Sequence, residues 1–220
     1  DIEEYGNHLK IYSLLKNKNI SVPKIIEKYD NDLMIISEDF GDLRFDKILQ
    51  KYPLGDLLHY AVDTLIVLKN SIQYDSKFSL PKYNFDMFKE EIFELPQYYF
   101  PHIKLYNKNL IDEFILIWSE AYRDIDFEFN NLIHKDFNMN NLILIPDNKD
   151  YLKCGVIDYQ SAFWGESSWD LFSLLEDSRV LFTDKYNKYF IEYFISQTSQ
   201  KSSIQDFLKK YYFLNASRQT

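Results

Sequence analysis

The chain has 220 residues, of which 46% are hydrophobic and 27% charged, a balance that fits a globular protein and excludes a disordered one. Its net charge of -9 at pH 7 gives no electrostatic case for a nucleic-acid partner, because nucleic-acid binders present a basic face. No apolar run reaches the length of a membrane helix, and the lone Cys154 excludes an internal disulfide. We therefore expect a cytoplasmic protein with neither a nucleic-acid nor a membrane partner.

The first forty residues combine a helical pattern with a hairpin pattern. Apolar side chains at helical spacing predict a helix over residues 1–18. Residues 24–29 and 33–37 predict two strands joined by the Asp-Asn-Asp turn at 30–32. An acidic segment follows the second strand and consists of Glu38, Asp39, Phe40, Gly41 and Asp42.

The middle of the chain is predicted to be helical. Apolar residues recur on one face over 54–73, 83–99 and 110–125. The second of these segments also carries Glu90, Glu91 and Glu94. A solvated helix face is the simplest interpretation of these acidic residues, and hydrogen bonding to a ligand is the alternative.

The region from Asn131 to Ser178 carries the chemically informative residues. His134, Asp136 and Asn141 form an H-x-D-x-x-x-x-N pattern, and Asp158 ends a later apolar run. The apolar pairs and runs around them predict short buried strands at 132–133, 142–145 and 156–157 that present polar residues at their ends.

Such a set of side chains suits phosphoryl transfer, which requires positioning more than covalent chemistry. One Asp orients the attacking hydroxyl and accepts its proton, while an Asn and a second Asp hold Mg²⁺ against the phosphates. Asp136 fits the first role, and Asn141 and Asp158 fit the other two. Two protein ligands suffice, because Mg²⁺ keeps several waters and takes phosphate oxygens as well.

Three helices are predicted after this region. Ser167 or Ser168 is expected to cap a helix over residues 169–181, and further helices are expected over 185–197 and 203–220. Trp164 lies just before the first of these helices, where lining a pocket and packing in the core are equally good interpretations.

The region 131–178 resembles the aminoglycoside phosphotransferase and choline kinase superfamily, small-molecule kinases that share the protein-kinase fold. The HKD triplet at 134–136 stands where these proteins have H-[RG]-D, and GVID at 155–158 stands where their strand ends in the metal-binding Asp. The match is most specific for bacterial kinases that phosphorylate the anomeric hydroxyl of N-acetylmuramate and N-acetylglucosamine. Their I/L-D-F-Q-D-A-x-x-G pattern is similar to IDYQSAFWG at 157–165, and the similarity continues through Trp169, Asp170 and Leu171 to Asp177.

The resemblance implies ATP as the phosphate donor and Mg²⁺ as the cofactor. It implies that His134 and Asp170 support the catalytic loop structurally, and that backbone groups of the hinge at Glu38, Asp39 and Phe40 bind adenine. It also points to Glu91, Gln160 and Arg218 as contacts with the acceptor, and Trp164 joins them as a candidate through its position.

The expected fold is therefore α/β, of the α+β kind, with the two-lobe layout of a protein kinase. Residues 1–40 would be the remainder of a small N-terminal lobe, with an αC-like helix, two strands and the hinge, and 41–220 a mainly helical C-terminal lobe. The glycine-rich loop and phosphate-binding Lys of such lobes have no match, so we expect the N-terminal lobe to be incomplete and the C-terminus to be truncated.

The expected activity is ATP-dependent phosphorylation of a small-molecule hydroxyl, on an amino sugar first. One alternative is a related kinase for choline, ethanolamine or an aminoglycoside, for which the acidic segment 90–94 would suit a cation. The other alternative is a non-catalytic, kinase-like binding module.

Overall fold

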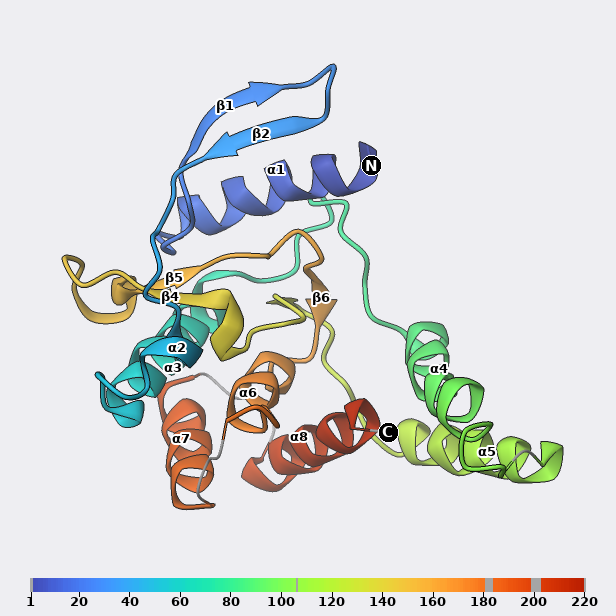
Figure 1. Cartoon of the computed structure of the whole chain (residues 1–220). Helices are drawn as coiled ribbons and strands as arrows, with labels where there is room; N and C mark the ends of the chain where they lie inside the picture. The colour runs from blue at the N-terminus through green and yellow to red at the C-terminus, as the bar shows by residue number, and fades with distance from the viewer. Residues whose placement is uncertain (1, 106, 181–183, 199–202, 220) are drawn as a thin grey trace.

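The computed structural model describes residues 2–105, 107–180, 184–198 and 203–219. A small N-terminal part with one helix and a two-stranded sheet precedes a larger part in which helices dominate (Figure 1). Helices and strands are mixed, as predicted, and every named strand pair is antiparallel. The predicted boundary between residues 40 and 41 stays a prediction.

The N-terminal part agrees with the sequence pattern. It consists of α1 (Ile2–Asn17), β1 (Ile25–Tyr29) and β2 (Met34–Ser37). Helix α1 buries Ile11, Leu14 and Leu15, which share one face at helical spacing. The hairpin pairs Ile25 with Ser37 and leaves most of its side chains exposed.

The larger part is built around α3, which packs against α7 and against the short strands β3 and β5. Its helices are α2 (Phe45–Ile48), α3 (Leu54–Ser71), α4 (Phe85–Glu94), α5 (Lys108–Arg123), α6 (Ser168–Leu175), α7 (Asp184–Gln197) and α8 (Ile204–Arg218). The helices predicted over 54–73, 110–125, 185–197 and 203–220 are confirmed to within two residues, apart from Thr220, which lies outside the described residues. None of the helices in the described ranges is long and apolar enough to cross a membrane.

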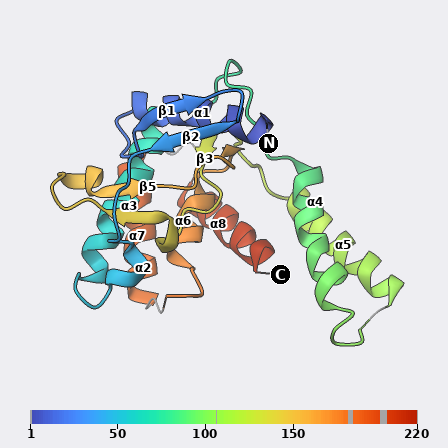
Figure 2. The same cartoon turned by 45° about the horizontal axis from the view of Figure 1, so that its top comes forward.

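Helices α4 and α5 form an antiparallel pair that extends away from the rest of the larger part (Figures 1 and 2). The helix predicted over 83–99 is α4 followed by a π-helical turn, Leu95–Tyr99. Pro96 lies in this turn and has no N–H to donate to the carbonyl one turn earlier, which favours the wider turn. Trp118 of α5 contacts Phe213 of α8, at 5.4 Å between ring centroids, and so ties the pair to the body.

Helix α6 begins within one residue of the predicted start, but the predicted side-chain cap and the predicted end were wrong. The Ser167 side chain does not cap the helix, because its hydroxyl bonds to Glu166 instead. The helix ends at Leu175 and not at 181, since Asp177 folds the chain into a turn in which its carboxylate accepts the N–H of Arg179 and its carbonyl accepts that of Val180. Residue 181 lies outside the described part of the chain.

Four short buried strands lie between α5 and α6 along the chain. They are β3 (Asn131–Ile133), β4 (Leu142–Leu144), β5 (Cys154–Val156) and β6 (Phe163–Gly165). Strand β3 pairs with β6 and β4 pairs with β5, and the 3-10 turns Met139–Asn141 and Asp150–Lys153 precede β4 and β5. The strands predicted at 132–133, 142–145 and 156–157 correspond to β3, β4 and β5, whereas β6 was not predicted.

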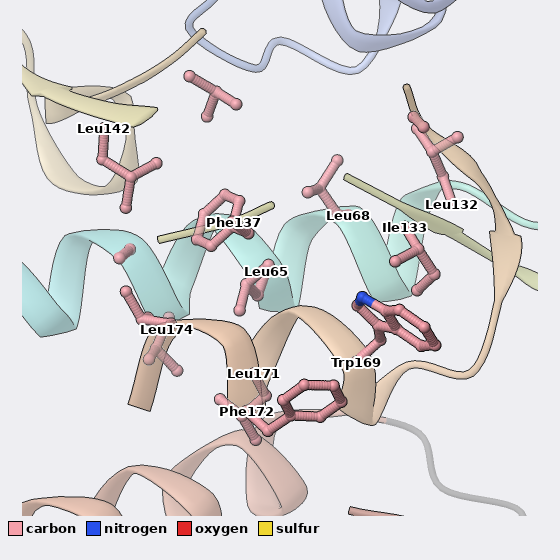
Figure 3. Close-up of a cluster of buried hydrophobic side chains, with 14 of the residues drawn as sticks. Leu65, Leu68, Leu132, Ile133, Phe137, Leu142, Trp169, Leu171, Phe172 and Leu174 are labelled. Atoms are coloured by element: carbon pink, nitrogen blue, oxygen red, sulfur yellow. The ribbon is translucent and has the colours of Figure 1, made fainter. Parts of the chain in front are cut away.

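The core lies between α3, α6 and this strand region. Figure 3 shows Leu65 of α3 on the side of Leu171 of α6, Phe137 beside α3, and Trp169 of α6 near Ile133 of β3. Phe137 is fully buried although it stands one residue after Asp136. The polar loop is therefore anchored by an apolar side chain directly beside its central carboxylate.

We predict that Gly165→Ala destabilises the fold. A Cβ at this position would lie 2.6 Å from Phe163 and 2.8 Å from Ile133, both of which are buried. Overpacking of this kind costs about 1–3 kcal/mol, measurable as a lower free energy of unfolding in urea. The control is Gly6→Ala in α1, where no atom lies within 4 Å of the new methyl group and stability should rise by about 0.5–1 kcal/mol. Equal unfolding free energies for the two variants would contradict this account.

Candidate active site

The loop that follows β3 is fixed by one buried carboxylate. Asp170 Oδ2 accepts the N–H of His134 at 2.7 Å, and Asp170 Oδ1 accepts that of Lys135 at 3.1 Å. Lys135 has a φ of +83°, in the left-handed region, and its carbonyl accepts the indole N–H of Trp169 at 3.1 Å. Two residues of α6 thus hold a turn that an ordinary side chain rarely adopts.

The same loop places the Asp136 side chain in a cavity. The Asp136 carbonyl accepts the backbone N–H of Asn138 and, at 2.9 Å, the side-chain N–H of Asn141. These bonds fix the backbone of Asp136 and leave its carboxylate half-exposed. One of its oxygens, Oδ1, accepts a hydrogen bond from Arg218 at 3.3 Å.

Asn141 and Asp158 are brought together by the β4–β5 pair. Leu142 is paired with Val156, and the N–H of Ile157 donates to the carbonyl of Asn141 at 3.1 Å. Asn141 therefore lies at the start of β4 directly opposite the residue before Asp158. Since the Asn141 amide N–H is bonded to Asp136, the amide oxygen is the atom left for a cation.

Asp158 lies in the left-handed conformation with a φ of +62° and is exposed. Its Oδ1 accepts a hydrogen bond at 2.8 Å from Gln160, which was predicted to contact the acceptor and here bonds to Asp158. No group of three or more His, Cys, Asp or Glu side chains that could hold a metal occurs among the described residues. The Asn141 and Asp158 oxygens suit Mg²⁺ only as a partial ligand set, completed by water and phosphate.

His134 connects the loop to the strand that carries Asp158. Its Nε2 lies 2.9 Å from the carbonyl of Ile157, which assigns the proton to Nε2 in the neutral ring. Burial lowers the pKa of His134, with the Ile157 carbonyl and the charges of Asp136 and Asp158 opposing the shift. A neutral, buried imidazole fits the structural role that was predicted for this residue.

Burial also raises the pKa of Asp170 to about 7, while its bonds to the His134 and Lys135 N–H groups oppose the shift. Asp170 contacts only backbone donors of the loop in the described structure, and its carboxylate is almost fully buried. Its position fits loop support and not contact with a substrate.

Two cavities meet at Arg218. The first, of about 650 Å³, is here called the Asp136 cavity, and the residues lining it include Asp136, Asn138, Asn140, Arg179, Asn215 and Arg218. The second, of about 550 Å³, is called the Glu91 cavity, and the residues lining it include Glu91, Glu94, Tyr98, Tyr99, Lys135 and Arg218. Both volumes fall in the range of ~300–1,000 Å³ that small-molecule sites occupy. Arg218 lines both cavities, and its guanidinium carbon lies 5.1 Å from the centroid of the Trp169 ring.

Glu91 differs from its acidic neighbours. It is half-buried and accepts a hydrogen bond at 2.5 Å from the hydroxyl of Tyr83, whereas Glu90 and Glu94 are exposed. Burial raises the pKa of Glu91, and the Tyr83 bond and the charge of Arg218 oppose this. The contact between Tyr83 and Glu91 was not predicted, because no local pattern connects a Tyr before a helix with a Glu eight residues later.

The residues predicted to form a hinge lie between β2 and α2. The Glu38 N–H already donates to Lys24 at 2.8 Å, and the Asp39 carboxylate accepts the N–H of Gly41 at the same distance. The ring of Phe40 lies against Gly155 of β5. Trp164 is fully buried in β6 and lines neither cavity, so of its two interpretations the structure gives core packing.

Comparison with solved structures identifies the class of protein. The chain is similar to the ADP-bound aminoglycoside phosphotransferase APH(2'')-Ib, with a TM-score of 0.63 and 19% identity over 94% of this chain and 70% of that one. It is also similar to an ethanolamine kinase of Plasmodium vivax, with a TM-score of 0.67 and 14% identity over 98% of this chain and 63% of that one. At these identities the likeness shows the fold, and the predicted protein-kinase-like class is confirmed.

Sequence comparison identifies the family. The model of the ecdysteroid kinase-like family matches residues 71–212, and the chain belongs to this family. The chain is also similar to the N-acetylmuramate/N-acetylglucosamine kinase of Caulobacter vibrioides, with 25% identity over 177 residues, 75% of this chain and 48% of that protein. It thus spans about half the length of this curated relative. The resemblance to the aminoglycoside phosphotransferase and choline kinase superfamily is confirmed.

We predict that buried His134 makes stability fall in mild acid. Since its pKa is lowered in the folded state, the unfolded chain takes up a proton below about pH 6.5 that the folded chain does not, at a cost of at most about 1.4 kcal/mol per pH unit. Urea unfolding of the wild type and of His134→Gln, which retains an N–H donor, should show a shallower loss between pH 7 and pH 5 in the variant. Parallel stability curves would contradict a neutral His134. Both proteins also share the contributions of His8, whose pKa burial lowers, and of Asp170, whose raised pKa favours the folded chain as the pH falls, so the difference between the two curves measures His134.

Proposed function

We propose that the protein transfers the γ-phosphate of ATP to a hydroxyl group of a small molecule, and that this molecule is an amino sugar. The observation that carries the proposal is the convergence of three groups: Asp136 in its cavity, and Asn141 and Asp158 at facing ends of β4 and β5. The name of the Caulobacter relative supports the choice of an N-acetyl amino sugar. A cytoplasmic location belongs to the same proposal.

In this proposal Asp136 acts on the acceptor. Its carboxylate orients the attacking hydroxyl and takes up the proton as the phosphate is transferred. Arg218 holds Oδ1 in the described structure, which leaves Oδ2 for the hydroxyl. The bonds that fix the backbone of Asp136 keep the carboxylate in place, so that little reorganisation is needed during the reaction.

Asn141 and Asp158 act on the nucleotide side. Their oxygens would hold Mg²⁺, which neutralises charge on the phosphates when it is bound. Gln160 orients the Asp158 carboxylate through its bond to Oδ1. The segment Glu38, Asp39 and Phe40 would receive adenine through backbone groups that are not already paired, because the Glu38 N–H bonds to Lys24.

A cationic acceptor such as choline, ethanolamine or an aminoglycoside is the second candidate. The observation that favours it is the Glu91 cavity, where Glu91 and Glu94 lie with Tyr98 and Tyr99. Carboxylates and aromatic faces both attract ammonium groups. Lys135 and Arg218 line the same cavity and oppose a cation, so the amino sugar ranks first.

Neutralising the Asp136 carboxylate and neutralising the Asp158 carboxylate are predicted to have different effects. In the full-length protein, Asp136→Asn should lower kcat by at least about 100-fold and leave the Kd for Mg²⁺-ATP near the wild-type value, because the Asp136 carboxylate is assigned to the acceptor and not to the nucleotide. Asp158→Asn should weaken nucleotide binding as well as turnover. Asp147→Asn, an exposed change in the turn after β4, is the matched control. Wild-type turnover in Asp136→Asn would contradict the assigned role.

The function itself is tested by ADP release from Mg²⁺-ATP with N-acetylmuramate, N-acetylglucosamine, choline and an aminoglycoside as acceptors. Turnover on the N-acetyl sugars alone is the expected result. Turnover on choline or the aminoglycoside would instead support the second candidate, a kinase for a cationic acceptor. If neither turnover nor nucleotide binding is detected, the non-catalytic binding module replaces both.

A further inference from the structure

The Asp136 cavity is the space from which an acceptor hydroxyl reaches Asp136. Asp136 lines this cavity and not the Glu91 cavity. A molecule bound with its hydroxyl at Asp136 therefore meets the other walls of the Asp136 cavity. The charges on those walls therefore bear on which charge the acceptor carries, in addition to the charges of the Glu91 cavity.

One wall holds a guanidinium group in a fixed position. Arg179 Nε lies 2.7 Å from Asp177 Oδ1, and Arg179 Nη2 lies 3.1 Å from Asp177 Oδ2, a two-point contact. The Asp177 side chain is 2% exposed, whereas the Arg179 side chain is 53% exposed and lines the cavity. A buried carboxylate thus orients an accessible guanidinium, whose Nη1 is not used in this contact.

The carboxylates that line the same cavity are already engaged. Asp177 is paired with Arg179, Asp136 with Arg218, and Glu176 accepts hydrogen bonds from Tyr211 and from Asn187. The Asn138, Asn140 and Asn215 amides and the two arginines line the same cavity and can supply N–H donors. An ammonium group in this space would face two guanidinium groups, while an anionic group would find donors that are held in place.

We propose that the acceptor carries a carboxylate in addition to its reacting hydroxyl, and that Arg179, oriented by Asp177, selects this carboxylate within the Asp136 cavity. The inference rests on the proposed phosphoryl transfer, since it uses Asp136 to place the hydroxyl. Arg179 determines specificity in this arrangement and takes no part in the transfer itself. Nothing in the sequence motif around Asp158 pointed to Arg179, which stands in the turn that ends α6 early.

The test compares N-acetylmuramate with N-acetylglucosamine, because the two sugars share a ring and differ by a carboxylate-bearing lactyl ether. The full-length wild-type protein should favour N-acetylmuramate in kcat/KM and in Kd. For N-acetylmuramate, Arg179→Gln should lower kcat/KM and raise Kd by roughly tenfold each, as expected for one half-exposed, charge-assisted contact. Both quantities should stay within twofold of the wild type for N-acetylglucosamine. Arg179→Lys should restore part of the loss, since it keeps the charge without the planar fork.

The matched control is Arg44→Gln. Arg44 makes the same kind of two-point contact with an Asp two residues away, at 2.6 and 2.9 Å from Asp46, and lines neither cavity. This variant should leave both sugars unchanged. The primary amide of N-acetylmuramate tests the same point on the wild type without a variant, and it should bind like the uncharged sugar.

The outcomes separate the two proposals. Turnover of both sugars with equal losses in Arg179→Gln, or full affinity for the amide, would overturn the carboxylate inference while phosphoryl transfer stands. Carboxylate-dependent Kd values that Arg179→Gln abolishes, without turnover, would support the inference and contradict the proposed function. Absence of binding and of turnover for both sugars would overturn both.

Discussion

The contact between the Asp170 carboxylate and the N–H groups of His134 and Lys135 is the constraint on which the site depends. It joins a buried helix to a loop whose central residue has a left-handed backbone. Without these two bonds the left-handed turn would keep only the Trp169 contact among the interactions with α6 that compensate its strain. The position of Asp136, one residue further along, follows from that turn and from the buried ring of Phe137 beside it.

Holding a carboxylate in the core is unfavourable by itself, and the raised pKa of Asp170 expresses that cost. Asp170 stays buried despite this cost because its neighbours Trp169 and Leu171 anchor α6 in the core on both sides of it. Trp169 also supports the loop directly through its indole N–H, and its ring makes a cation-π contact with Arg218. One helical turn therefore positions both the loop backbone and the cation beside Asp136.

Sequence patterns predicted the helices and strands whose formation depends on residues close to one another along the chain. The apolar spacing of α3 and the polar residues at the ends of β4 and β5 were sufficient to place those elements. The end of α6 was missed because Asp177 forms a local turn that outweighs the apolar spacing. The bond between Arg218 and Asp136 spans 82 residues, and no periodicity reports a contact at that separation. Arg179 was missed for a different reason, because its importance comes only from the cavity that the fold creates around it.

The measurement that tests this account most directly is kcat for acceptor-dependent ADP release by the Asp170→Asn variant of the full-length protein. An amide has one acceptor oxygen and presents an N–H to the second backbone donor, so the loop should shift while the fold persists. The account predicts a loss of about 100-fold in kcat, with thermal melting confirming a folded protein. A folded variant with wild-type kcat would show that Asp136 is positioned without Asp170, which contradicts the central claim.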